Sequence, residues 1–154
     1  MVPAVLAGGL AAGVLDISAA CAYYAARGVR PLRILQSVAG GIYGRATFQG
    51  GWSTAAQGLA LHFFIATVAA LVFTLAALRL PALVSRPLAF GALYGVAVWA
   101  FMHFVVLPLS AVGRRPFDPT MAAIMVAIHI ACVGIPIALA ARRFLTPPPP
   151  GRWW

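Results

Sequence analysis

The sequence has no lysine, and only two of its 154 residues are acidic. All eleven basic residues are arginines, so charged residues make up 8% of the chain, against about 25% in an average soluble domain. That is too little charge to cover a water-facing surface of this size. The shortage of charged side chains therefore excludes an ordinary soluble domain.

The sequence also has no basic helix and no basic segment interleaved with aromatic residues, the features that would indicate nucleic-acid binding. Its net charge of +9 comes from arginines that stand at the ends of apolar runs. In that position arginine anchors a helix and faces anionic lipid headgroups. We therefore expect a lipid bilayer as the main partner and no nucleic acid.

Signatures of familiar enzyme chemistry are missing as well. The chain shows no Ser-His-Asp order, no phosphate-binding loop and no paired carboxylates, so we expect no hydrolase or kinase activity and assign no catalytic residue. Its two cysteines, Cys21 and Cys132, both fall inside apolar runs, which argues against a disulfide framework. These absences favour a protein without enzymatic activity.

Long apolar runs are what the sequence does contain, with 63% hydrophobic residues. A transmembrane helix needs about 20 consecutive apolar residues. The sequence predicts an all-α integral membrane protein, a bundle of four transmembrane helices occupying residues 1–144, followed by a Pro-rich tail at 145–154 that ends in a pair of tryptophans. The predicted spans are residues 2–26, 53–78, 87–110 and 120–141.

The connection between the first two spans is the longest, covering residues 27–52. Pro31 suits the first position of a helix, and the segment between Arg33 and Arg45 is too short to cross a bilayer. We expect an interfacial or re-entrant segment here, with Leu32, Leu35, Val38 and Ile42 on one side and Gln36 elsewhere.

Each predicted span carries one ionisable side chain at mid-depth: Asp16, His62, His103 and His129. With a rise of about 1.5 Å per residue, the four fall within about one helical turn of the same level. An aspartate at mid-bilayer costs about 2.5–3.5 kcal/mol on insertion scales. We therefore expect a buried Asp/His layer that either holds the helices together or relays protons.

Two other interpretations use the same residues or the same helices. Three imidazoles and a carboxylate are suitable metal ligands, so His62, His129, His103, Asp16 and Cys132 are candidates for a metal site, and opposed histidines are candidates for haem. The cofactor, if any, stays unknown from the sequence. Alternatively, the chain is an accessory subunit that packs against a larger membrane complex through its small-residue helix faces. A homo-oligomer stays open as well, because no feature of the sequence specifies one.

A faint internal repeat relates the two halves of the chain. The segment "AGGLAAGVLD" from Ala7 resembles "AFGALYGVAV" from Ala89, and His62 and His129 each open a run that ends in "AAL" or "IAL". This predicts two helical hairpins in the same orientation, related by an axis along the membrane normal.

The pieces "RILQSVAGG", "GLALHFFIA" and "FVVLPLSA" resemble a family of small, uncharacterised inner-membrane proteins that is widespread in bacteria. The likeness covers roughly residues 9–143, and the matching positions are Asp16, His62 and His129. It implies a four-helix, multi-pass domain of the bacterial inner membrane and no particular activity. The Ala-, Gly- and Arg-rich composition without lysine is typical of a GC-rich bacterial genome.

Overall fold

The computed structural model describes residues 1–113 and 116–146, and these residues form helices and short connections. Four helical runs are long and apolar enough to cross a membrane: Val2–Ala25, Gly51–Arg79, Pro87–Leu109 and Pro119–Leu145. These runs match the four predicted apolar helices, and the largest difference in bounds is a fourth run that continues to Leu145. The predicted Pro-rich tail from residue 147 onward lies outside the described residues.

The first and second runs are single helices, α1 (Val2–Ala25) and α3 (Gly51–Arg79), whereas the third and fourth contain π-helical segments. The third run consists of α5 (Pro87–Phe101), η2 (Met102–Val106) and α6 (Leu107–Leu109), and the fourth of α7 (Pro119–Ile128), η3 (His129–Gly134) and α8 (Ile135–Leu145). The connections hold α2 (Pro31–Tyr43), the 3₁₀ segment η1 (Gly44–Gln49) and the short α4 (Ala82–Ser85).

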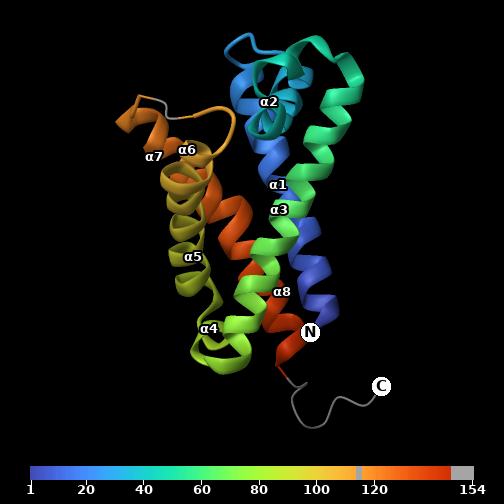
Figure 1. Ribbon diagram of the computed structural model, residues 1–154. Coiled ribbons are helices and arrows are strands. Elements are labelled where there is room, and N and C mark those ends of the chain that lie inside the picture. Colours follow the sequence, from blue (N-terminus) through green and yellow to red (C-terminus); the bar gives the residue numbers. More distant parts are fainter. Residues whose placement is uncertain (114–115, 147–154) are drawn as a thin grey trace.

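The fourth run occupies the centre of the bundle. Its α8 packs against α1, α3 and α5, and successive runs are antiparallel (Figure 1). Helices α3 and α5 diverge toward the end of the bundle that carries α2. Nearer the opposite end, Tyr94 of α5 contacts α3. The Tyr94 hydroxyl donates to the carbonyl oxygen of Ala69 at 2.7 Å, and its ring centroid lies 5.0 Å from that of Phe73.

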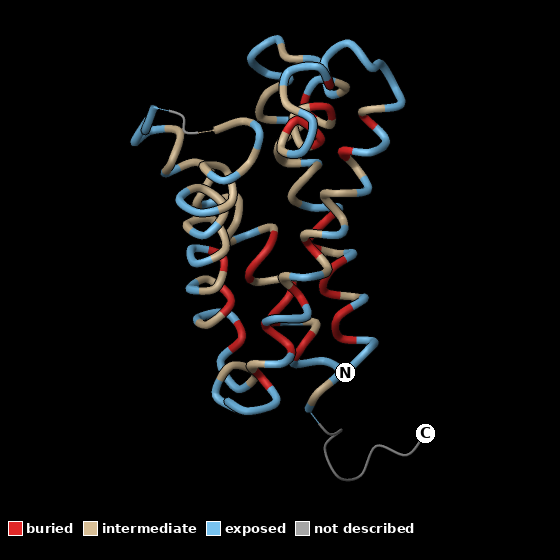
Figure 2. Tube along the Cα trace, viewed as in Figure 1, coloured by how far each residue is buried: buried red, intermediate tan, exposed pale blue. Residues whose placement is uncertain are grey.

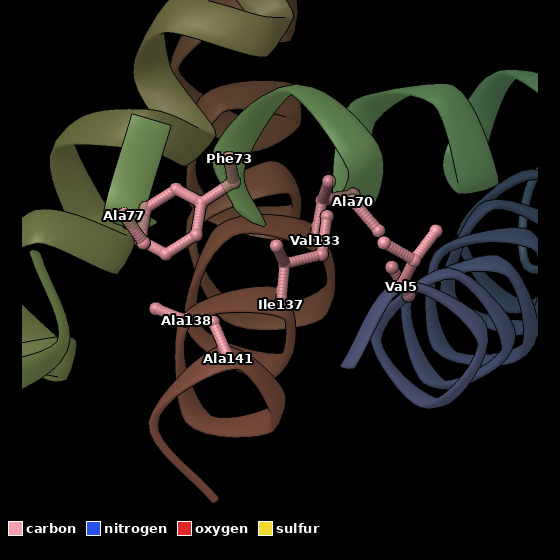
Figure 3. Packing of buried hydrophobic residues seen from close by; sticks show 9 residues of the cluster. Val5, Ala70, Phe73, Ala77, Val133, Ile137, Ala138 and Ala141 are labelled. Atoms are coloured by element: carbon pink, nitrogen blue, oxygen red, sulfur yellow. The ribbon is translucent and has the colours of Figure 1, made fainter. Parts of the chain in front are cut away.

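The core is built mainly of small side chains, while large apolar side chains face outward. Buried residues line the inner faces of the helices and the outer faces are exposed (Figure 2). Figure 3 shows Phe73 and Ile137 surrounded by alanines and valines of the same cluster. Exposed side chains include Leu10, Phe64 and Leu93, at 61%, 64% and 64% of their maximum. This inverted distribution suits lipid, because membrane helices gain stability from close packing and not from hiding apolar surface.

Glycines allow the closest helix contacts, and they recur in both halves of the chain. A Cβ on Gly91 would lie 2.9 Å from the carbonyl oxygen of Gly134, and one on Gly95 would lie 2.6 Å from that of His129. In the first hairpin, a Cβ on Gly9 would lie 2.8 Å from Thr67 Cα, and one on Gly13 would collide with the ring of Phe63. Gly9 and Gly13 align with Gly91 and Gly95 in the predicted repeat, so the equivalent positions make equivalent helix contacts.

Both π-helical segments precede a proline. Pro108 follows η2 and Pro136 follows η3. A proline lacks the amide that would bond to the carbonyl four residues earlier, and its ring clashes with that carbonyl. The helix widens there by taking the i→i+5 pattern, which is rare and found often at functional sites.

Helix α2 begins at Pro31, as predicted, but its buried side differs from the prediction. Gln36 is only 2% exposed, and its side-chain amide donates to the carbonyl oxygen of Gly51 at 3.0 Å and to Thr54 at 3.3 Å. The predicted apolar face included Ile42, which is 58% exposed. The prediction was wrong because these hydrogen bonds offset the cost of burying the amide and turn that side of α2 toward α3.

We expect Gly134→Ala to lower the free energy of unfolding by about 1–3 kcal/mol, because the added Cβ would collide with the backbone of Gly91 and Gly95. Gly41→Ala is the matched control: its Cβ would meet nothing closer than Ser110 Cβ at 3.9 Å, and helix propensity favours alanine by about 0.5–1 kcal/mol. Thermal or SDS unfolding of the full chain in detergent measures both. Equal stability of the two variants would contradict this packing.

Candidate functional site

The four predicted polar residues do not form a buried layer. Only Asp16 and His129 approach one another, with 3.9 Å between Asp16 Oδ1 and His129 Nδ1, and their side chains are 18% and 19% exposed. The prediction of a buried Asp/His layer was therefore wrong. Side chains at equal depth would meet only if the four helices ran parallel and turned those side chains toward one another. The helices instead cross and diverge, so residues at similar depth point in different directions.

His62 forms a helix-to-helix hydrogen bond. Its Nε2 lies 2.9 Å from the carbonyl oxygen of Gly13, and because a carbonyl only accepts, this Nε2–H is the donor. The bond joins α3 to α1 at the crossing where Gly13 meets Phe63. His62 is thus held in a structural contact and does not face the other two histidines.

His103 lies in an aromatic cluster at the α7 end of the bundle. Its ring stacks on Trp99, with centroids 5.1 Å apart and 16° between the planes. Phe104 and Phe117 present their edges to it at 4.8 and 5.7 Å. Within the described residues no hydrogen bond to His103 is present, so its ring nitrogens keep their capacity to bind a ligand.

A cavity of about 330 Å³ lies between α1, the third run and the fourth run. Three of the chain's four methionines and two of its three histidines line this one cavity. The lining residues are Tyr24, Trp99, Met102, His103, Leu107, Pro116, Asp118, Met121, Ala122, Met125 and His129. Sulfur and imidazole nitrogen therefore supply most of the groups there that can bind a metal.

His129 is oriented by its own helix. Its Nδ1 lies 2.9 Å from the carbonyl oxygen of Met125, so Nδ1–H donates and the lone pair of the neutral ring is on Nε2. Among the described residues Nε2 has no hydrogen-bond partner. Metal-binding histidines commonly show this arrangement, with one ring N–H held by a carbonyl and the other nitrogen on the metal.

Two tyrosines hold Met121. The hydroxyls of Tyr23 and Tyr24 lie 3.5 and 3.8 Å from its sulfur, and the Arg27 guanidinium lies 3.7 Å from the Tyr23 ring centroid. Methionine is the most adaptable apolar side chain. These contacts tie the Met121 thioether to α1 and reduce its freedom at the cavity wall.

The predicted metal set is only partly brought together. Of Asp16, His62, His103, His129 and Cys132, only His103 and His129 line the cavity. Within residues 1–113 and 116–146 no three His, Cys, Asp or Glu side chains are close enough to hold a metal ion together. The ligands predicted from the sequence were nitrogen, oxygen and thiol groups, and the methionines were not among them.

A signal for the methionines was present in the sequence. Met121, Met125 and His129 are spaced four residues apart, which places them on one side of a helix. Met102 directly precedes His103 and falls in the same π-helical segment. The spacing could have indicated a thioether and imidazole face, but it could not show that the faces of the third and fourth runs meet.

No protein-family model, curated protein or solved structure matches this chain. The resemblance to small bacterial inner-membrane proteins stays a prediction, and the geometry of the cavity is the observation that bears on function.

Proposed function

We propose that this chain is a non-enzymatic, multi-pass protein of a bacterial inner membrane that binds a soft monovalent metal ion, of the Cu(I) class, in the cavity between its first, third and fourth runs. The observation that supports this is the gathering of Met102, Met121, Met125, His103 and His129 around one cavity. Thioethers select Cu(I), and imidazole is also a good ligand for copper.

The composition of the cavity fits a singly charged cation better than a divalent one. Its methionine and neutral histidine ligands bring no charge. Asp16 supplies a carboxylate beside His129, and Asp118 lies at the outer end of the cavity, where its Oδ1 already accepts from the amides of Thr120 and Met121 at 2.9 and 3.1 Å. Little negative charge is therefore available to compensate a buried ion, which favours a monovalent one.

The size of the cavity favours an ion over haem. A volume of about 330 Å³ lies at the lower end of the range for small-molecule sites, about 300–1,000 Å³. The nearest ligands to the free Nε2 of His129 in sequence are Met125 and Met121, one and two turns before it. We assign these three as the principal ligands, with His103 and Met102 on the facing wall.

A second candidate function follows from the approach of Asp16 to His129. Asp16 Oδ1 lies 3.9 Å from His129 Nδ1, and His129 lines the cavity, so the pair places two proton-accepting groups beside the cavity. Toward the N-terminus of α1, the described core around Ala12, Ala70 and Ile137 has one ionisable side chain packed against it, the phenol of Tyr94.

The accessory-subunit alternative stays open. The small residues Gly8, Gly9, Ala12 and Gly13 of α1 are buried against α3 and α8 within the chain. A larger complex would have to use the exposed apolar faces instead.

For α2 we propose an interfacial position. The 29 residues of α3 are about 43 Å long, longer than a hydrocarbon core of about 30 Å. Helix α2 packs against the first two turns of α3, through Gln36 with Gly51 and Thr54 and through Leu35 with Gly58. If the rest of α3 spans the hydrocarbon core, the first two turns of α3 and the helix α2 beside them lie outside that core.

We expect the full chain in detergent, under anaerobic reducing conditions, to bind one Cu(I) in competition with a chromophoric Cu(I) chelator. Met125→Leu and His129→Leu should each weaken binding by about ten-fold or more, because each removes a ligand. X-ray absorption should show sulfur and nitrogen neighbours. His62→Leu is the matched control, since it removes an imidazole at mid-depth outside the cavity, and it should bind Cu(I) normally.

Two results would contradict the metal assignment. One is an equal loss of affinity in His62→Leu and His129→Leu. The other is a wild-type affinity that disappears only in a Cys21→Ser, Cys132→Ser variant, which would place the ion at the thiols.

The proton candidate predicts that Asp16→Asn abolishes acid-driven proton uptake into proteoliposomes containing a pH-sensitive dye, while His62→Leu keeps it. The physical reason is that asparagine has no carboxylate to accept a proton beside His129. Unchanged unfolding of Asp16→Asn in detergent would show that the fold is intact. Proton uptake equal to that of empty liposomes in the wild type would refute this candidate and leave the metal assignment untouched.

A further inference from the structure

A continuous groove, separate from the methionine cavity, opens where α3 and α5 diverge. It consists of two apolar cavities of about 440 and 460 Å³ that share Ile65 and Met102. The upper cavity lies between α2, α3 and the η2–α6 segment, and the lower lies between α3 and α5. Tyr94 closes the lower end with its hydroxyl bound to Ala69.

The upper end of the groove adjoins a polar pocket of about 370 Å³, and Ser37 and Val112 line both. Arg45 lines this pocket and is exposed. Its neighbour Gly44 has a φ of 66°, a backbone conformation that side chains disfavour. Arg33 lies over the ring of Phe48, which lines the same pocket, with its guanidinium 5.2 Å from the ring centroid. Arg45 therefore lines the polar pocket, and Arg33 is a second cation in contact with one of its lining residues, Phe48.

Neither cation has an acidic partner among the described residues. The whole chain offers only Asp16 and Asp118 to balance eleven arginines, and Asp16 is paired with His129. The pocket is therefore complementary to an anion. Guanidinium groups suit phosphate in particular, because their planar fork can donate two hydrogen bonds to it.

The groove has the length of one membrane leaflet. Leu61 and Val72 mark its extent along α3, and eleven residues of helix rise about 16 Å. Half of a hydrocarbon core of about 30 Å is about 15 Å. An apolar groove of that length, directed inward from a cationic pocket at the interfacial level of α2, matches the shape and charge of one lipid.

We propose that this groove and the Arg45 pocket form a binding site for one anionic phospholipid of the surrounding bilayer, with its phosphate at Arg45 and an acyl chain between α3 and α5. The inference requires that the chain spans a bilayer and does not depend on the metal site. Backbone bonding at the mouth, where the amide of Ala111 donates to the carbonyl oxygen of Gly41 at 2.9 Å, holds α2 against the end of the third run and keeps the site formed.

The test is phospholipid retention by the full chain purified in mild detergent, measured by phosphate assay and native mass spectrometry, followed by thermal unfolding with added lipid. We expect about one phospholipid per chain and a higher unfolding temperature with phosphatidylglycerol than with phosphatidylcholine. Arg45→Gln should weaken the phosphatidylglycerol effect about five-fold in concentration, the usual contribution of one arginine near anionic lipid. Arg79→Gln, at the opposite end of the bundle, should leave it unchanged.

Groove-filling variants test the acyl-chain part. Ala97→Phe in the lower groove and Gly41→Val in the upper should each abolish lipid retention, while Leu93→Phe, on a lipid-facing side of α5 that lines no described cavity, should keep it. Having two filling variants guards against a folding defect in one. Equal protection by phosphatidylcholine, equal retention in all variants, protection by inorganic phosphate alone, or a cross-linked second copy in the groove would each overturn the proposal.

Discussion

The close backbone contact between α5 and the fourth run is the constraint on which the rest of this structure depends. Gly91, Gly95 and Gly134 remove the side chains that would separate the two helices, and in a bilayer such packing replaces the hydrophobic effect as a source of stability. The contact fixes the carbonyl of His129 against Gly95. Toward the end of the bundle that carries α2, the third and fourth runs separate, and the cavity occupies the space between them.

The same crossing explains why polar chemistry gathers at one end of the bundle. Below it, alanines and valines pack tightly around Phe73 and Ile137. The π-helical turn His129–Gly134, which precedes Pro136, forms the crossing itself, and the π-helical turn Met102–Val106, which precedes Pro108, lies on the cavity side of it. A π turn rotates the side chains that follow it relative to a regular α-helix, so the widened turns help to decide which side chains of the two runs face each other.

The two proposed sites differ in chemistry but share a wall. The cavity offers thioethers and imidazoles, which suit a soft ion, and the groove offers an apolar channel below exposed arginines, which suits an amphiphile. Met102 lines both. Met102 is the first residue of η2. Because α5 diverges from α3 on one side and from α7 on the other, this residue lies between the groove and the cavity.

The sequence by itself determined the four long apolar helices and the helix that begins at Pro31, because apolar run length and the helix-starting preference of proline are local properties. It placed Asp16 and His129 at one depth correctly, since depth follows from a constant rise per residue. Only the tertiary structure decided which residues meet. His62 turned to the Gly13 carbonyl, His103 stacked on Trp99, and the methionines of two runs converged, because these outcomes depend on how each helix rotates and crosses its neighbours, which no single apolar run encodes.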